Sequence, residues 1–305
     1  MRSIRKALLR KLGLGSSVSR PCGDLAFNDN PRFTKWLAGS GTLHEPFVVI
    51  DVGVQGGESP RWHFFGDHLI VHGFDAIREA ITALSETKAP GRHYHWMAIG
   101  NEDGEREFFF KSDNPTNSTF YVARTPEHQV RRVPIRRLDT LLAEGLLPKA
   151  DFLKVDVEGF ERDVFLGAAA VLPDVLGVET ETNFNSSPIY PDTHFGFVLA
   201  TLHQRGLTLV DINFNRVRST AYLEARRRRA LPDLPVEGAG RPATVNVLFC
   251  RQAPAALNID RALKLIAIYE LHGLNDIATD TAVMFAAELA QRLDVEHAIS
   301  LLCEP

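Results

Sequence analysis

The stretch FVVIDVGVQGG, residues 47–57, decides the fold of this chain. Its first four residues are apolar and three of them are β-branched, which predicts a buried strand. Asp51 closes the strand, and glycines follow at positions 53, 56 and 57. Glycine suits a turn against which a small ligand lies, because a Cβ atom would block the approach or forbid the φ angles of the turn. The stretch therefore predicts a strand, a turn and a ligand site.

The spacing of these glycines argues against a dinucleotide. Its fingerprint G-x-G-x-x-G, counted from Gly53, requires glycines where this chain has Gln55 and Glu58. A glutamate beside a pyrophosphate would also repel it. The acid at the strand end instead suits a ligand with cationic or hydrogen-bonding parts. S-adenosylmethionine, which has an amino-acid end, a sulfonium and no phosphate, meets that requirement; an ordinary strand-to-helix turn is the alternative for this motif alone.

A second apolar run, LIVHGFDA at residues 69–76, also ends in an acid, Asp75. In nucleoside-binding α/β folds, an acid at the end of the second strand binds the ribose hydroxyls, about 20 residues after the glycine turn. Residues 58–67, between the two runs, predict a helix that exits through Gly66. The order strand, glycine turn, helix, strand and acid is that of a βαβ unit.

The stretch DFLKVDVEGFE, residues 151–161, predicts a third strand of the same sheet. Its polar residues Lys154 and Asp156 alternate with apolar ones, and Asp156 and Glu158 fall at its C-terminal end. Because the ligand crevice of an open parallel sheet lies outside the carboxyl ends of its strands, these acids are expected at the same edge as the earlier two. A further strand at 175–178 is followed by Glu179 and Glu181, which adds two more acids to that edge.

The rest of the chain completes a doubly wound, mostly parallel, seven-stranded α/β sheet. Residues 94–99 predict another strand, and residues 207–217 and 244–250 predict the last two, with the final strand antiparallel. Residues 256–302 are apolar at helical spacing and predict a helical hairpin, which packs on the domain or pairs with a second copy in a homodimer. The expected parts are a basic segment (1–30), the α/β domain (31–252) and the helical hairpin (253–305).

Composition is that of a soluble globular protein. The chain has 305 residues, of which 45% are hydrophobic and 24% charged, and a net charge of −4, which gives no global attraction to nucleic acid. Its three cysteines are far apart and match no metal spacing, so we expect free thiols in a reducing, cytoplasmic setting. No apolar run approaches the roughly 20 residues that span a bilayer.

Two segments are strongly basic. Residues 1–20 contain six Lys or Arg and no acid, and predict either an amphipathic helix peripheral to an anionic membrane or a frayed terminal helix. Residues 219–242 include four consecutive arginines, 226–229. This connection is either a lid that grips an anionic glycan acceptor or a solvated helix face followed by a loop.

Taken together, these motifs resemble the FkbM-type S-adenosylmethionine-dependent methyltransferases. The matching pieces appear in the family's order: VVIDVGVQGG, GFDA, AIGNEDGEREFF, NST at 117–119, VPIRRLDTLL and DFLKVDVEGFERDVFLGA. The resemblance covers roughly residues 46–252 and departs at Gln55, usually asparagine, and at Asp75-Ala76, usually glutamate-proline. It implies a Rossmann-like class I fold and methyl transfer to a hydroxyl of a sugar, surface glycan, or glycosylated or polyketide metabolite. The expected cofactor-binding residues are Asp51, Gly53, Gln55, Gly57, Asp75, Ala76, Ala98, Ile99 and Asp156.

Methyl transfer to an alcohol needs a base, since an alcohol is a poor nucleophile. The candidates are Asp156, which has the best position, together with Glu158, Glu181, His72 and His194. Asp156 and Glu181 could instead hold a divalent cation such as Mg²⁺ that lowers the pKa of the acceptor hydroxyl. Neutralisation of the clustered acids by Lys154 is the alternative to a metal.

Two other functions remain open on the sequence alone. One is a non-catalytic module that binds the cofactor and assembles through its helical tail. The other is an RNA methyltransferase, which is disfavoured because no basic face with interleaved aromatic residues is evident apart from residues 226–229. A small-molecule or glycan acceptor is therefore the expected partner, and no nucleic acid is.

Overall fold

The computed structural model of the chain describes residues 25–112, 114–115, 118–120, 128–185, 193–229, 240–252 and 257–303. The basic segment 1–20 and Asn117 of the NST motif lie outside these residues, and so do residues 230–239 of the long connection.

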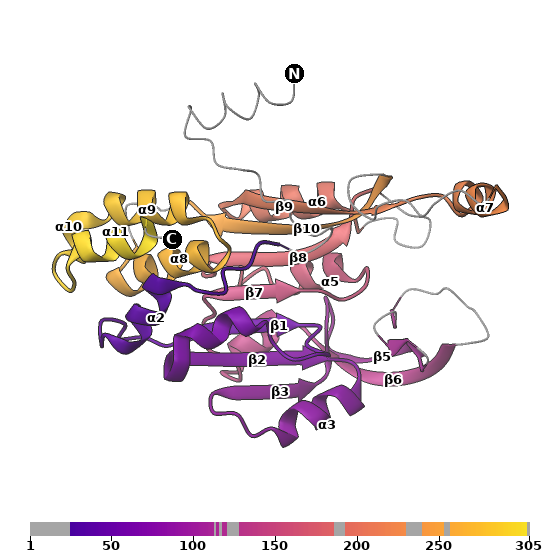
Figure 1. Ribbon diagram of the computed structural model, residues 1–305. Coiled ribbons are helices and arrows are strands. Elements are labelled where there is room, and N and C mark those ends of the chain that lie inside the picture. The colour runs from indigo at the N-terminus through magenta and orange to yellow at the C-terminus, as the bar shows by residue number, and fades with distance from the viewer. Residues whose placement is uncertain are drawn as a thin grey trace.

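A seven-stranded sheet forms the centre of the molecule, as the sequence predicts (Figure 1). Its order is β3-β2-β1-β7-β8-β10-β9, and β10 runs antiparallel to both of its neighbours while the other pairs are parallel. The strands are β1 Phe47–Val52, β2 Leu69–Asp75, β3 Arg92–Trp96, β7 Phe152–Val155, β8 Gly177–Asn183, β9 Leu207–Val217 and β10 Arg241–Arg251.

Helices cover both faces of the sheet. One face packs against α4 (Leu138–Ala143), α5 (Glu161–Leu166) and α6 (Phe195–Gln204). The other face packs against α2 (Arg32–Gly39), η1 (Pro60–His68) and α8 (Ile259–Leu271). Helix α3 (Arg78–Glu86) follows β2. The two faces bury separate clusters of apolar side chains, as expected for a doubly wound α/β fold.

The strand expected over residues 94–99 is divided between two sheets. The backbone of Met97 turns by donating a hydrogen bond to His95 O, so β3 ends at Trp96. The pair Ala98–Ile99 forms β4, which joins a small three-stranded sheet with β6 (His128–Arg136) and β5 (Gly104–Lys111) in the order β4-β6-β5. This small sheet becomes one wall of the ligand site.

The helix expected over residues 58–67 is a 3-10 helix, η1, interrupted at Gly66, where φ is +55°. Side chains at i and i+3 eclipse in a 3-10 helix. The spacing therefore lets Trp62 and Phe65, both fully buried, point together into the core beneath β1.

The expected hairpin after residue 256 contains four helices rather than two. They are α8, α9 (Asn275–Met284), α10 (Ala286–Leu289) and α11 (Val295–Cys303), and they gather at the end of the sheet opposite α7 (Thr220–Arg228; Figure 1). Helix α8 is buried along nearly its whole length and shares the core of the sheet. Val283 and Met284 of α9 stay exposed, and pairing with a second copy remains a prediction. No helix in the described ranges is long and apolar enough to cross a bilayer.

Candidate functional site

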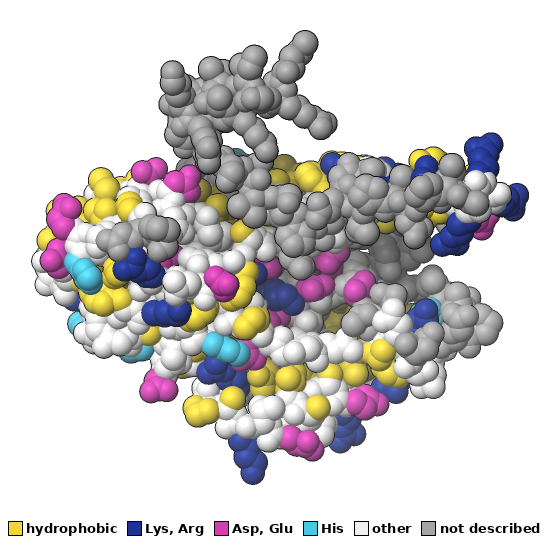
Figure 2. Space-filling view, in the orientation of Figure 1, with side chains coloured by type: hydrophobic (Ala, Val, Ile, Leu, Met, Phe, Trp, Pro, Cys, Tyr) yellow, Lys and Arg dark blue, Asp and Glu magenta, His cyan; other side chains and the backbone are white. Residues whose placement is uncertain are grey.

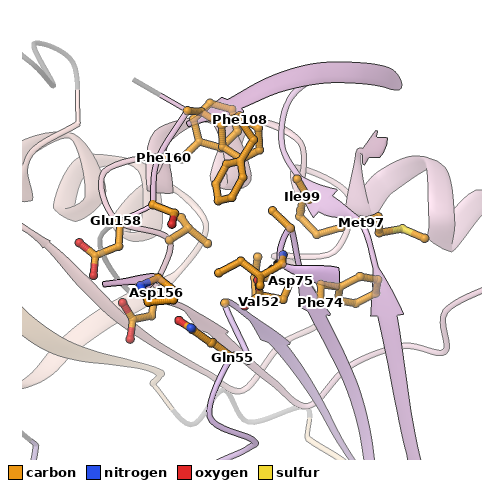
Figure 3. Close-up of a pocket in the computed structure, with 18 of the residues that line it drawn as sticks. Val52, Gln55, Phe74, Asp75, Met97, Ile99, Phe108, Asp156, Glu158 and Phe160 are labelled. Atoms are coloured by element: carbon orange, nitrogen blue, oxygen red, sulfur yellow. Dashed lines mark hydrogen bonds between the residues drawn. The ribbon is translucent and has the colours of Figure 1, made fainter. Parts of the chain in front are cut away.

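A cavity of about 530 Å³ lies at the carboxyl ends of β1, β2 and β7 (Figure 3). Most of the residues expected in the site line it. Those residues are Gly53, Gln55, Gly57, Asp75, Ala76, Ala98, Ile99, Asp156 and Glu158. The prediction that separate acids and the glycine turn meet at one edge of the sheet is thus met by the geometry.

Four other candidates do not line the cavity. Asp51 is fully buried behind the wall. Glu181 accepts hydrogen bonds from Thr244 Oγ1 and Asn215 Nδ2 on the neighbouring strands, and His194 is the N-cap of α6 and accepts from the backbone of that helix. His72 lies against the imidazole rings of β3. Neither histidine is therefore placed to act on a ligand in the cavity.

The glycine turn is fixed by contact with the turn after β7. Gly53 has φ of +90°, and a Cβ atom there would lie 1.8 Å from the backbone oxygen of Asp156. The amides of Gly53 and Val54 both donate to Phe74 O, and Asp156 N donates to Val52 O. The ends of three strands are thus locked together, which explains why glycine is required here.

Lys154 forms the polar floor of the site. Its Nζ lies 3.3 Å from Asp51 Oδ1 and 3.5 Å from Asp156 Oδ2. Burial raises the pKa of Asp51 to about 6, although Lys154 opposes the rise. Burial disfavours the charge of Lys154, but Asp51, Asp156 and Glu179 together raise its pKa. A buried charge needs such partners, so Asp51 acts by holding the lysine and contacts the cavity only through it.

Asp75 ends β2 at the mouth of the apolar half of the cavity. Its Oδ1 accepts a hydrogen bond from Ile77 N at 2.7 Å, which fixes the side chain. Burial raises the pKa of this carboxyl to about 6. The neighbouring backbone is held as well, because the indole nitrogen of Trp96 donates to Ala76 O at 3.1 Å. The position and rigidity suit the ribose-binding role that the sequence predicts.

An aromatic wall that the sequence analysis missed closes the other side. Phe108 comes from β5, Phe120 from the loop after it and Phe160 from the turn before α5. The ring centroid of Phe120 lies 5.0 Å from that of Phe108 and 4.7 Å from that of Phe160. In Figure 3, Phe108 and Phe160 lie on one side of the cavity and Gln55 with Asp156 on another. The run of three phenylalanines at 108–110 was the available signal.

The turn after β7 has an unusual backbone. Glu158 has φ of +52°, and Gly159 follows with φ of +95°. For a residue other than glycine, this left-handed conformation is uncommon and persists only where its surroundings enforce it. Thr119 Oγ1 donates to Glu158 O at 3.2 Å, and Gly159 N donates to Glu161 Oε1 at 3.0 Å. These bonds hold the Glu158 carboxylate at the rim of the cavity.

Within the described ranges, neither Glu158 nor Glu161 has a cationic partner, whereas Asp156 of the same turn lies 3.5 Å from Lys154 Nζ. Desolvation raises the pKa of Glu158 to about 7, and the charges of Asp156 and Glu181 add to the rise. Glu161 is buried, and burial raises its pKa to about 8. Carboxyl groups with such values exchange protons near neutral pH.

The residues present fit S-adenosylmethionine. A volume of about 530 Å³ is in the range of small-molecule sites. The aromatic and aliphatic wall suits an adenine ring, and Asp75 suits the ribose hydroxyls. The carboxylates around Lys154 suit the cationic, amino-acid half of the molecule and would repel a pyrophosphate.

Comparison with known proteins decides the family. The profile of the methyltransferase FkbM domain matches residues 51–208, which is more than half of the chain. The chain belongs to this family. A comparison with curated proteins gave no match.

Several solved methyltransferases resemble this FkbM protein. A putative S-adenosylmethionine-dependent methyltransferase from Listeria monocytogenes is 11% identical, with 72% of this chain and 99% of that chain covered and a TM-score of 0.35. The N-methyltransferase NodS from Bradyrhizobium japonicum WM9, in complex with S-adenosyl-L-homocysteine, is 10% identical, with coverage of 74% and 90% and a TM-score of 0.33. A putative sarcosine dimethylglycine methyltransferase from Galdieria sulphuraria is 12% identical, with coverage of 81% and 97% and a TM-score of 0.36.

The FkbM protein is thus an S-adenosylmethionine-dependent methyltransferase, and the lining of its cavity fits that cofactor. The predicted Mg²⁺ site at Asp156 and Glu181 finds no support. Within the described ranges, no group of three or more His, Cys, Asp or Glu side chains is placed to hold a metal ion. Lys154, between Asp51 and Asp156, supplies the neutralising charge that a cation would otherwise provide.

Proposed function

We propose that this methyltransferase acts on a hydroxyl group of a sugar, a surface glycan, or a glycosylated or polyketide metabolite, with Glu158 as the base. The observation that carries the proposal is the carboxylate of Glu158 at the rim of the cofactor cavity, with its pKa raised to about 7. A base is most effective when its pKa lies near the working pH. An alcohol, unlike a neutral amine, needs one.

Glu158 suits this role better than Asp156, which sequence position alone favours. Asp156 lies 3.5 Å from the ammonium group of Lys154, so its carboxylate is engaged in an ion pair and is less available to an acceptor hydroxyl. We therefore assign Asp156 to the electrostatics of the cofactor site. Glu158 has no cationic partner in the described part of the chain, and its side chain is open to an acceptor arriving from solvent.

The protein's part in the reaction is alignment and proton removal. When bound, S-adenosylmethionine supplies the methyl group to the acceptor oxygen. The cavity walls fix the direction of approach, which accounts for much of the rate of an in-line displacement. Glu158 takes the proton of the hydroxyl as the new carbon–oxygen bond forms, and releases it to solvent afterwards.

The test is transfer of label from S-adenosylmethionine to a panel of glycans and glycosylated metabolites. Glu158→Gln should lower kcat by about 10²–10⁴-fold, the usual contribution of a general base. Cofactor affinity, measured by calorimetry, should stay within about twofold of the native value because Glu158 lies at the rim. Glu288→Gln, at an exposed position on α10, is the matched control and should change neither quantity.

The pH profile gives an independent check. The base must be deprotonated, so kcat/KM should fall as the pH drops below about 7, the value to which the pKa of Glu158 is raised. In Glu158→Gln that acid limb should disappear from the residual activity. An unchanged limb in the variant, or full turnover, would remove Glu158 from the mechanism.

A further inference from the structure

The last hairpin of the sheet extends beyond its neighbour. Strand β10 pairs with β8 only from Thr244 to Cys250, whereas it pairs with β9 from Arg241 to Arg251. The two strands therefore leave the sheet as a ribbon, and α7 lies at its tip (Figure 1). We call residues 216–229 and 240–242 the arm.

The arm projects from the edge that holds the cofactor cavity. Because β10 is antiparallel to both β8 and β9, the C-terminal end of β9 lies on the same side as the ends of β1 and β7. Strands β7 and β8 pair up to Val155 and Thr180, so the next residues, Asp156 and Glu181, lie at the same level. On the other side of β8, Glu181 pairs with Asn246 of β10. Arg241 lies five residues further along β10. At about 3.4 Å per residue, the base of the arm is about 17 Å further along the strand direction than Asp156, and β10 lies two strands, about 10 Å, to the side of β7.

Positive charge gathers on this arm. Seven of the sixteen described residues in 216–229 and 240–241 are arginine, and one, Glu224, is acidic. The intervening residues 230–239 add Asp233 and Glu237 and no basic residue, so the sequence 216–241 carries a net charge of +4. The whole chain, by contrast, has a net charge of −4. Arg227, Arg228 and Arg229 are exposed, and Figure 2 shows the dark-blue side chains at the tip of α7. Such a field attracts anions and raises their local concentration.

A hollow at the base of the arm has the donors that an anion requires. Its volume is about 520 Å³, and its lining comprises Val217, Arg218, Ser219, Tyr222, Gly240 and Arg241. The Ser219 hydroxyl oxygen accepts from Tyr222 N, which leaves its own proton free to donate. Guanidinium groups bind phosphate through paired hydrogen bonds, which makes arginine the preferred residue for this group. The half-exposed ring of Tyr222 offers a flat apolar surface beside it.

We propose that the arm binds a phosphate or pyrophosphate group of the methyl acceptor, held about 20 Å from the hydroxyl that is methylated. The acceptor is then an extended, phosphorylated glycan that spans the distance from Arg218 and Arg241 to Glu158. This inference rests on the proposed function, and it identifies the class of acceptor within it.

The first experiment measures the anion site without any acceptor. Inorganic pyrophosphate is titrated into the full chain by calorimetry at low salt. The double variant Arg218→Ala/Arg241→Ala should bind pyrophosphate at least about tenfold more weakly, since charge-assisted pairs are lost. The control Arg132→Ala/Lys149→Ala removes two charges from side chains that are 74% and 76% exposed, and should bind as the native chain does. Equal affinity in the arm variant and the native chain would overturn the proposal.

The second experiment separates this inference from the proposed function. Label transfer from S-adenosylmethionine is measured for oligosaccharides long enough to span this distance, linked to a nucleoside diphosphate in solution or to a prenyl diphosphate in vesicles, each compared with the same oligosaccharide after phosphatase treatment. The two panels distinguish a soluble from a lipid-linked acceptor. We expect kcat/KM to be at least about tenfold higher for the phosphorylated form, and the arm variant to lose that difference through KM while cofactor binding is unchanged.

Each result has a distinct meaning. Equal transfer to phosphorylated and phosphatase-treated sugars would disprove the role of the arm and leave the proposed function in place. Absence of transfer to any sugar, with pyrophosphate still bound through Arg218 and Arg241, would disprove the proposed function and keep the anion site. Binding of a single-stranded oligonucleotide that saturating pyrophosphate does not displace, lost in the arm variant, would assign the arm to nucleic acid and overturn the proposal.

Discussion

Two sets of carboxylates in this protein differ in their partners and therefore in their acidity. On the face covered by η1 and α8, Glu179 lies 3.0 Å from Arg61 and 3.3 Å from His272. Burial works against its charge, but Arg61 and His272 hold the pKa of Glu179 at about 2. In the turn after β7, Glu158 at the exposed rim and the buried Glu161 face no cation within the described ranges, and desolvation raises their pKa to about 7 and about 8.

The comparison shows that burial alone does not decide what a carboxyl group does. A buried acid that is paired with arginine stays ionised over the working pH range and fixes packing. A buried acid without a partner keeps a proton near neutral pH and can exchange it. The first kind contributes to stability and the second to chemistry, so substitutions in the two sets should fail in different assays.

The largest loss of stability should follow Glu179→Gln. Arg61 and His272 would lose the carboxylate opposite them, and breaking such a buried pair costs about 3–5 kcal/mol in the free energy of unfolding. Urea denaturation followed by circular dichroism measures this. Glu288→Gln, on the surface, should stay within about 0.5 kcal/mol of the native chain. A loss below about 1 kcal/mol for Glu179→Gln would mean that the paired set is not structural.

The second largest loss of stability is expected for Gly53→Ala, which tests whether the turn after β7 is held against the end of β1. The added Cβ atom would overlap the backbone oxygen of Asp156, so we expect a loss of about 2–4 kcal/mol in unfolding free energy and loss of cofactor binding by calorimetry. Gly41→Ala is the matched control: Gly41 also has positive φ, at +71°, but no atom lies within 4 Å of its Cβ position. It should cost only about 1 kcal/mol and leave the cofactor affinity unchanged.

Equal effects of these two alanines would show that backbone conformation, and not contact between the turns, accounts for the glycine at position 53.

A smaller effect concerns pH. The pKa of Glu161 is raised to about 8 in the folded chain, above its unfolded value near 4.5, so the native state binds the extra proton. Stability from this group is fully present below about pH 4.5 and is lost as the pH rises through 8. We expect Glu161 to lower the unfolding free energy by about 3–4 kcal/mol between pH 5 and pH 8, and Asp51, Asp75 and Glu158, whose pKa values are also raised, to add to this fall.

Glu161→Gln should reduce that fall by the contribution of Glu161, because an amide does not titrate. Its Oε1 atom can still accept from Gly159 N, so the turn is preserved. Glu179 provides the contrast within the same curve. Its lowered pKa makes a contribution that is lost only as the pH falls from about 4.5 to about 2. A native curve that is flat from pH 5 to pH 8 would contradict the protonated state of Glu161.

The sequence predicted the sheet and the main features of the cavity because both depend on local patterns. Apolar runs locate the strands, and acids at strand ends converge wherever strands are parallel. Gly53, Asp75 and Asp156 line the site for this reason. The resemblance to FkbM proteins then named the family, which the matched residues 51–208 confirm.

The partners of each acid could not be predicted from the sequence, because they come from segments that are distant along the chain. Arg61 and His272 lie 118 and 93 residues from Glu179. Asp51 was expected to contact the ligand, but Lys154 lies between Asp51 and the cavity. This placement follows from the register of β1 and β7, which pairs Asp51 with Lys154. The aromatic wall was missed because Phe108 reaches the cavity through the small sheet, and that sheet forms by pairing of β5 with β6.

The smallest predicted effect tests what holds Glu158 in its left-handed conformation. Thr119→Val keeps the shape of the side chain but removes the hydroxyl that donates to Glu158 O at 3.2 Å. Loss of one such bond should cost about 1 kcal/mol of unfolding free energy. The larger consequence is catalytic, because a Glu158 carboxylate that is free to move spends less time beside the acceptor. We expect kcat to fall by about tenfold while cofactor affinity changes little.

Thr87→Val is the matched control, since its hydroxyl also donates to a backbone oxygen, that of Leu84, at an exposed site away from the cavity. It should lower stability by no more than about 1 kcal/mol and leave kcat unchanged. If both variants reduce kcat equally, the bond to Glu158 has no special role. If Thr119→Val lowers stability but not kcat, the bond between Gly159 N and Glu161 is sufficient to hold the left-handed backbone of Glu158. Glu158 and Glu161 would then need no support from the loop that carries Thr119.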